Sequence, residues 1–496
     1  MTDGSAPDRL YQLCLARLCP ALEKIGSKLD WNPAIAGPLD KLASRIAEDL
    51  LTYASKDATY WNDSWVIFLT PKISSAILKW DRFILEFVGK RCKNLRRVFF
   101  KWVAEKFDTS LLGLLPKSVC SVDFDGELYY RGRSSFPDFG QQSWLPEAEG
   151  IFRSLLLSYK KQHSLNDKCL VELHLGTSSV SADQLTQVLR TAPNIRLLRH
   201  YQLVSALYKL HSESWKSGST IPTYKLNNLD ADFSHVVRCR MSPQAVLPGD
   251  AMRLASQLCP DVASVRVRID CSTPHDILGP LTSFKRLREL SVVCVTSGER
   301  CNLDFSDICP ILEAHGETSL TSLELKVIEE VESHQIVFLC PRLEVLVLSG
   351  CGFVCPPTCG SFMCANNPRY LRKLKLLFYA DGDDFSWTHN VPQCFWKAAL
   401  TSVGPTKKSR LSGLFLESPR ITETTARELW TAGQTVLYPE LRVVSLLRYS
   451  EITLDDVRNL TRGAPLKYLR ATDCERLHSK RLRQMFTSQG LVICTS

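Results

Sequence analysis

The chain has 496 residues, of which 45% are hydrophobic and 23% are charged. This balance is ordinary for a folded protein and excludes a disordered, coiled-coil or fibrous chain as the main architecture. The formal charge of +9 is spread along the chain without a run of five or six basic residues, which disfavours a nucleic-acid-binding arm and is compatible with an acidic partner.

The first residues and the cysteines indicate the compartment. Residues 1–8 are polar and lack a signal-peptide pattern, and no apolar stretch reaches the ~18–20 residues that a membrane span needs. The 19 cysteines are odd in number and often lie in apolar runs, which predicts reduced, mostly buried thiols. We therefore expect a cytoplasmic or nuclear protein without a membrane partner.

Three helices are predicted at the start of the chain. Residues 9–25 place an apolar stripe on one helical face, made of Leu10, Leu13, Cys14, Leu18 and Leu22. After a turn rich in Pro and Gly, residues 39–50 repeat this pattern, and a third helix is expected from near Pro71 towards Val88. These elements predict a helical module over residues 1–90.

From residue 91 onward, a motif of the form L-x-x-L-x-L recurs. The clearest copies are Leu170–Leu175, Leu287–Val292, Leu320–Leu325, Leu343–Leu348, Leu371–Leu376, Leu411–Leu416, Leu441–Leu446 and Leu466–Ala471. Four consecutive copies start 33, 23 and 28 residues apart, which is the length of one strand, one helix and two turns. The motif is that of leucine-rich repeats. It predicts an α/β horseshoe solenoid over residues 91–496, with parallel strands inside and helices outside.

Several repeats carry a Cys-Pro pair ahead of the strand. The pairs are Cys259-Pro260, Cys309-Pro310 and Cys340-Pro341. Because Pro ends a helix and a small Cys fits a tight turn, we predict that Cys259, Cys309 and Cys340 are buried free thiols near helix ends. These repeats resemble the cysteine-containing repeats of leucine-rich substrate receptors of ubiquitin ligases.

The residues between the motif leucines are expected to line the concave sheet, because side chains alternate along a strand. They mix charge with apolar and aromatic groups, which is typical of a protein-binding face, and they form no uniform basic track for nucleic acid. The predicted binding residues are Glu324, Lys326, Val345, Val347, Lys373, Lys375, Phe415 and Tyr468. Further outward positions are Glu172, His174, Glu289, Ser291, Glu417, Val443, Ser445 and Arg470.

The sequence predicts neither a catalytic centre nor a cofactor. No P-loop, dinucleotide-binding fingerprint, G-x-S-x-G or H-E-x-x-H motif occurs. One cysteine cluster, Cys351, Cys355, Cys359 and Cys364, invites a zinc interpretation, but its spacing lacks paired C-x-x-C knuckles. We expect a loop with free thiols there and no metal.

The first helix carries a more specific resemblance. Leu10, Cys14 and Leu18 fit the pattern L-x-x-x-C-x-x-x-aliphatic, which resembles the BC box of substrate receptors that bind Elongin C. The downstream segment resembles a cullin-selecting box through Pro38, Leu39, Leu42 and Ile46. The order of boxes and repeats is similar to that of Zyg-11-like and PRAME-like receptors. This resemblance implies a ligase substrate receptor that binds Elongin C, Elongin B, cullin 2 and its RING subunit.

Three alternatives stay open on the sequence alone. The stripe at Leu10, Cys14 and Leu18 fits packing against the first repeats equally well, since apolar stripes usually mark core. Residues 69–78 resemble the start of an F-box, which would imply Skp1 and cullin 1. The chain can also be a leucine-rich scaffold with no ligase link. The target, its degron and the oligomeric state have no sequence signal.

Overall fold

In the computed structural model the chain forms two compact units, residues 1–231 with 257–260, and residues 232–256 with 261–496. The structure describes residues 73–79, 82–101, 116, 118–124, 171–176, 182–192, 194–233, 248–270, 275–295, 303–354, 370–377, 395, 410–417, 438–448, 452–474, 476–477, 482, 486 and 492–495. The predicted BC-box residues Leu10, Cys14 and Leu18 and the cullin-box residues Pro38, Leu39, Leu42 and Ile46 lie outside this set.

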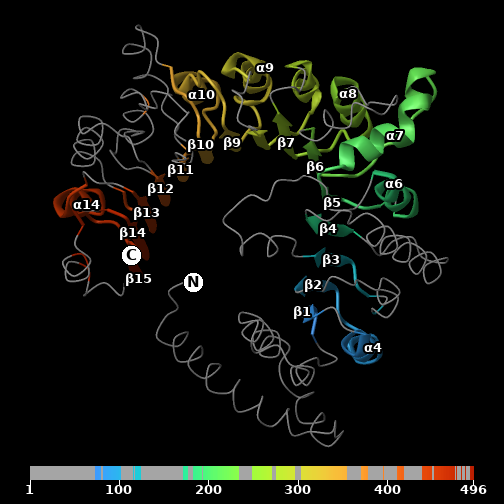
Figure 1. Ribbon diagram of the computed structural model, residues 1–496, viewed down its shortest axis with the longest axis horizontal. Helices are drawn as coiled ribbons and strands as arrows, with labels where there is room; N and C mark the ends of the chain where they lie inside the picture. Colours follow the sequence, from blue (N-terminus) through green and yellow to red (C-terminus); the bar gives the residue numbers. More distant parts are fainter. Residues whose placement is uncertain are drawn as a thin grey trace, which may run out of the picture. The chain divides into compact units, whose positions relative to one another are not determined.

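The first unit contains a five-stranded parallel sheet whose strands follow chain order (Figure 1). Its strands are β1 (Ser75–Lys79), β2 (Arg97–Lys101), β3 (Ser121–Phe124), β4 (Glu172–Gly176) and β5 (Leu197–His200). Its described helices are α4 (Arg82–Arg91), α6 (Ala182–Thr191) and α7 (Leu203–Lys216). Parallel strands in sequence order require a crossover after each strand, as a repeat solenoid has.

The predicted helix from near Pro71 towards Val88 is wrong for its first part and confirmed over residues 82–88, which belong to α4. Residues Ser75–Lys79 form β1, which pairs in parallel with β2, and the helix begins only at Arg82. Ala76 and Leu78 are buried two residues apart, which is the period of a strand. The sheet therefore begins within residues 1–90, the range predicted to be a helical module.

Strands β6 to β15 form a ten-stranded sheet, again in chain order, and the strands pair in parallel from β7 to β15. They are β6 (Asn228–Asp232), β7 (Ser264–Asp270), β8 (Glu289–Val295), β9 (Ser322–Lys326), β10 (Val345–Ser349), β11 (Lys373–Leu377), β12 (Gly413–Glu417), β13 (Val443–Leu447), β14 (Tyr468–Thr472) and β15 (Val492–Thr495). The other described helices are α8 (Pro248–Leu258), α9 (Phe305–His315), α10 (Ser333–Leu339) and α14 (Leu454–Leu460), and short turns η6 (His275–Ile277) and η7 (Gly279–Ser283) precede β8. This arrangement confirms the predicted α/β solenoid of leucine-rich repeats.

The motif leucines form the core between the sheet and its helices. In the repeat of β9, Leu320, Leu323 and Leu325 are fully buried, and each such side chain stabilises the fold by about 1.5–3 kcal/mol. Figure 1 shows α9 and α10 side by side along one face of β8–β10. The opposite face of these strands is therefore the one that carries the outward side chains.

A left-handed residue ends several strands of the second unit. Val327, Gly350, Arg448 and Asp473 have φ of 56°, 60°, 59° and 55°, and each stands two residues after the last inward side chain of its strand. The amide of Val327 donates to the carbonyl of Ser349 over 2.8 Å. The amide of Arg448 donates likewise to Thr472 over 2.9 Å. These bonds continue the ladder for one residue beyond each strand.

The cysteines of the Cys-Pro pairs differ from one another. Cys259 and Cys340 are buried free thiols directly after α8 and α10, as predicted. Cys309 is a free thiol as predicted, but the prediction is wrong about its burial and position, because it is only half-buried and lies with Pro310 inside α9. The helix continues past Pro310 because Ile308, Ile311 and Leu312 bury its apolar face. Cys294 is disulfide-bonded, so the expectation of reduced thiols does not hold for that residue.

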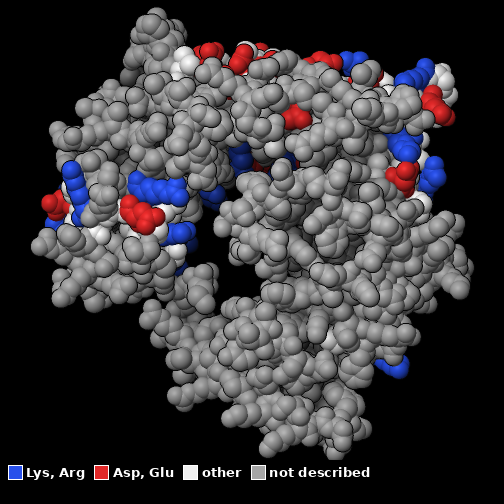
Figure 2. All heavy atoms as spheres, viewed as in Figure 1, with Lys and Arg blue, Asp and Glu red and all other residues white. Residues whose placement is uncertain are grey.

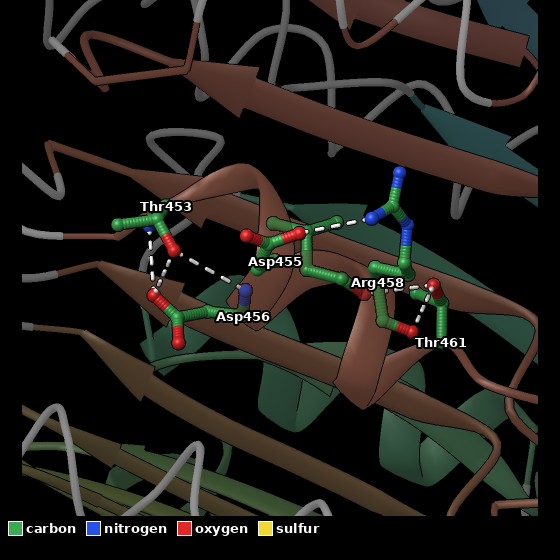
Figure 3. A network of polar contacts seen from close by, with 6 residues as sticks. Thr453, Asp455, Asp456, Arg458 and Thr461 are labelled. Carbon is green, nitrogen blue, oxygen red and sulfur yellow. Dashed lines mark hydrogen bonds and ion pairs between the residues drawn. The ribbon is translucent and has the colours of Figure 1, made fainter.

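Local polar contacts fix the start of α14 (Figure 3). The hydroxyl of Thr453 accepts a 3.3 Å hydrogen bond from the amide of Asp456, and the Asp456 carboxylate accepts a 2.9 Å bond from the amide of Thr453. This reciprocal capping box satisfies amides that the first turn of a helix leaves open. Arg458 pairs with Asp455 over 2.9 Å on the exposed side of the same helix.

Candidate functional site

The outward side chains of β7–β14 form one surface, which we call the strand face. Strand register aligns them in rows. The first row is Ser264, Glu289, Ser322, Val345, Lys373, Gly413, Val443 and Tyr468, and the second is Arg266, Ser291, Glu324, Val347, Lys375, Phe415, Ser445 and Arg470. The eight predicted binding residues all lie on this face, with Lys326 in a third row.

At β7–β9 the charges of the strand face neutralise one another. Glu324 accepts a 2.7 Å hydrogen bond from the Ser291 hydroxyl and lies 2.9 Å from Lys326 Nζ. Its other neighbour is Arg266, whose Nη2 is 3.5 Å away. Arg268, two residues further along β7, pairs with Asp232 over 3.5 Å. We call Arg266, Ser291, Glu324 and Lys326 the paired cluster.

The protonation of Glu324 follows from these contacts. Burial alone raises the pKa of its carboxyl, but hydrogen bonds from Lys326 and Ser291 and the charges of Lys326 and Arg266 outweigh that effect and hold the pKa below its ordinary value. Glu324 is thus ionised, and its charge is already paired with Lys326 and Arg266. The same hydrogen bond explains why Ser291 is buried, although its outward position predicted exposure.

β10 carries an apolar strip between two polar regions. Val345 and Val347 are half-buried there, with Leu346 and Leu348 buried beneath the sheet. Neither valine is needed to fill the core, because its side chain points to the opposite side from the motif leucines. Their exposed area is therefore free to be covered by another molecule.

On β11 and β12 an aromatic ring is held between a glycine and a lysine. Lys373 Nζ lies 5.3 Å from the centroid of the Phe415 ring, within the range of a cation–π contact. A Cβ built on Gly413 would come within 3.1 Å of Phe415 Cε2 and 3.8 Å of Lys373 Cγ. The ring therefore lies against the backbone of its own strand, and a side chain at position 413 would make a tight contact with it.

Strands β10–β14 carry basic but no acidic outward residues in the first two rows. Lys373, Lys375 and Arg470 occupy these rows, and Glu417 stands one row further along β12. Arg442 and Lys467, both exposed, directly precede β13 and β14. Figure 2 shows Lys and Arg side chains grouped near β12–β14 at the left of the view, together with acidic ones. We call Lys373, Lys375, Phe415, Tyr468 and Arg470 the basic-aromatic cluster.

Arg266 and Gly413 were missing from the predicted outward positions, and Ser291 was predicted only as an outward position and not as a binding residue. Arg266 and Ser291 complete the environment of Glu324, and Gly413 seats Phe415. Gly413 could have been identified from the local sequence. A glycine two residues before an outward aromatic residue on the same strand leaves space for the aromatic ring above the backbone. The signal for Arg266 was not local, because its contact depends on how two distant repeats align.

The thiols and the described helices give no second type of site. Cys351 is buried, donates weakly to the carbonyl of Leu325 over 3.4 Å, and has its pKa raised by burial to about 11. It is therefore a protonated core thiol, while Cys355, Cys359 and Cys364 lie outside the described residues. Within the described ranges no three metal-ligating side chains gather, and no helix there is long and apolar enough to cross a bilayer.

Comparison with known proteins adds little to this description. No protein-family model and no curated protein matches the chain. Among solved structures, the leucine-rich repeat-containing protein LegL7 from Legionella pneumophila is similar at 14% identity over 58% of this chain and 78% of that chain, with a TM-score of 0.27. A TM-score this low supports no conclusion about function, and the assignment of the fold rests on the strand order, the register and the repeats.

Proposed function

We propose that this chain is a protein-binding module without a catalytic centre, and that the strand face of β7–β14 receives its partner. The observation that carries the proposal is the partly exposed set of Val345, Val347, Phe415, Val443 and Tyr468, which is framed by charged residues on strands fixed by buried leucines. Aromatic and apolar side chains with a polar surround are typical of interface centres. A rigid scaffold beneath them lowers the entropy cost of association.

Site-specific crosslinking tests this proposal. A photo-crosslinking residue placed at Val347 is expected to capture protein partners that the same residue at Phe338, an exposed position on α10, does not capture. A captured partner is then purified and its affinity is measured with the unlabelled chain. We expect Val347→Arg to weaken that affinity and Phe338→Arg to leave it unchanged. Equal capture from both positions, or no effect of Val347→Arg, would contradict the proposal.

We further propose that the chain is the substrate-recognition subunit of an Elongin B/C–cullin 2 ubiquitin ligase. What supports this is the resemblance of Leu10, Cys14 and Leu18 to a BC box, and of Pro38, Leu39, Leu42 and Ile46 to a cullin box. In this proposal the N-terminal helix docks in a groove of Elongin C, and the ubiquitin chemistry belongs to the other subunits. Such a receptor would act in the cytoplasm or the nucleus.

Co-purification tests the ligase proposal. The full chain, expressed with Elongin B and Elongin C, is expected to form a stable complex that the double change Leu10→Asp and Cys14→Arg abolishes. The melting temperature of the repeats should stay nearly unchanged, because a terminal helix contributes little to distant repeats. Loss of the fold together with the complex would favour the core-packing alternative for this helix.

The two other functional alternatives differ in their support. An F-box at residues 69–78 is disfavoured, because Ser75–Lys79 form a strand of the sheet and Ile73 and Leu78 are fully buried. A leucine-rich scaffold without a ligase link would use the same strand face. It is distinguished by retaining its partner while failing to bind either Elongin C or Skp1.

A further inference from the structure

The strand face contains two regions of opposite electrostatic character. In the paired cluster, Arg266 and Lys326 both have a carboxylate partner in Glu324, and the neighbouring Arg268 has Asp232. Within the described part of the chain, no carboxylate lies within 4.0 Å of the Lys373, Lys375 or Arg470 side-chain nitrogens. Lys373 contacts the Phe415 ring instead, and Arg470 donates to the hydroxyl of Thr472 over 3.3 Å. The second region therefore carries positive charge that the described fold does not neutralise.

The spacing of these charges suits an extended chain. Lys375, Phe415, Ser445 and Arg470 are neighbours in one row across β11–β14. With strands ~4.8 Å apart, the row places Lys375 and Arg470 ~14 Å from each other. An extended peptide rises ~3.3–3.4 Å per residue, so side chains about four residues apart match this distance. Phe415 then lies beneath the residue between them.

We propose that the basic-aromatic cluster binds an extended acidic segment of a partner protein, with carboxylates about four residues apart at Lys375 and Arg470 and an apolar side chain between them on Phe415. This inference rests on the proposed function and names the chemistry of the partner. Arg470 presents a planar fork that suits a carboxylate, and Lys375 supplies a point charge. Val443 and Tyr468, in the adjoining row, extend the apolar contact.

The same surface fits a nucleic acid less well. A strand of RNA needs a basic track that follows successive phosphates and aromatic rings on which bases stack. Here Val345 and Val347 adjoin the basic residues on one side, and the anionic Glu324 lies beyond them on β9. Apolar side chains and a carboxylate at that point favour a peptide that itself mixes acidic and apolar residues.

Fluorescence anisotropy with the full-length chain tests the inference. The probe is a labelled peptide of Ser and Gly that carries Glu at its first and fifth positions and Leu at its third. We expect saturable binding that weakens as salt is raised. Lys375→Glu and Arg470→Glu should each weaken binding at least about tenfold. Lys285→Glu, the same charge change at an exposed lysine ahead of β8, should leave it unchanged.

Matched probes give the decisive outcomes. A peptide with Gln in place of both Glu should bind at least about tenfold more weakly. A peptide with Lys at both positions should bind the double variant Lys375→Glu, Arg470→Glu and not the natural chain. The inference is overturned by equal binding of the Gln peptide, by an equal effect of Lys285→Glu, by no saturable binding up to about 1 mM, or by a short single-stranded RNA that binds the cluster more tightly than the peptide.

The crosslinking experiment at Val347 distinguishes a failure of the acidic-peptide inference from a failure of the proposed protein-binding function. Capture of a partner at Val347 without acidic-peptide binding would overturn the inference alone and leave the protein-binding role intact. Absence of both would overturn the two together.

Discussion

The Phe415 ring lies against Gly413 on β12, where an added Cβ would approach ring atom Cε2 to 3.1 Å. We predict that Gly413→Val displaces the ring and weakens binding of the acidic peptide by about 0.5–1.5 kcal/mol, the range of a lost aromatic or cation–π contact. Anisotropy measures the change. Because both side chains act through the same ring, Gly413→Val should add little when Phe415 is already Ala. Full additivity of the two changes would show that Gly413 does not position Phe415.

Glu324 makes the stability of the fold depend on pH. Its folded pKa lies below the ordinary value of 4.5, so its contacts contribute full stability above that value, and this contribution is lost as the pH falls through the folded pKa. We predict that Glu324→Gln costs about 1 kcal/mol near neutral pH, since Arg266 and Lys326 are partly exposed. The difference from the natural chain should shrink as the pH falls below 4.5.

Denaturant unfolding at a series of pH values checks this expectation. Asp261→Asn is the control, because Asp261 pairs with Arg286 at an exposed site and such pairs contribute little. A pH-independent effect of Glu324→Gln would show that the paired cluster does not hold the carboxylate in its charged form.

The left-handed residues at the strand ends allow a reciprocal test. Val327 is β-branched, and its left-handed backbone conformation destabilises the fold by ~1–2 kcal/mol. Gly350 occupies the equivalent position one repeat later and adopts this conformation without steric strain. Since glycine also loses ~0.5–1 kcal/mol through backbone entropy, we predict that Val327→Gly raises the free energy of unfolding by up to about 1 kcal/mol. Gly350→Val should lower it by at least about 1 kcal/mol. Unfolding in denaturant measures both, and changes of the same sign would contradict the assignment.

Thr453 caps α14 through its hydroxyl (Figure 3). We predict that Thr453→Ala lowers the free energy of unfolding by about 1 kcal/mol, because an amide of the first turn loses its acceptor and Asp456 loses a donor. Thr453→Ser keeps the hydroxyl and should cost much less. If both variants lost the same stability, the threonine methyl rather than the capping box would be responsible.

The repeat motif and the side-chain alternation along a strand were readable in the sequence. Leu320, Leu323 and Leu325 point inward and Glu324 and Lys326 outward, because this pattern depends only on the geometry of one extended segment. The same local rule misassigned residues 75–79 as helix, although it was right for residues 82–88. Ile73, Ile77 and Leu78 fit a helical stripe, and pairing with β2 selected the strand instead.

Which outward residues meet was decided only by the tertiary structure. Ser291 and Glu324 are 33 residues apart and touch because β8 and β9 align in one register, and Lys373 reaches the Phe415 ring because β11 and β12 do. Repeats of unequal length bring these strands together, so sequence spacing does not reveal the neighbours. The charge of each residue was thus known from the sequence. That Arg266 of β7 is paired with Glu324 of β9, and that Lys375 lies in one row with Phe415, follows from long-range strand pairing.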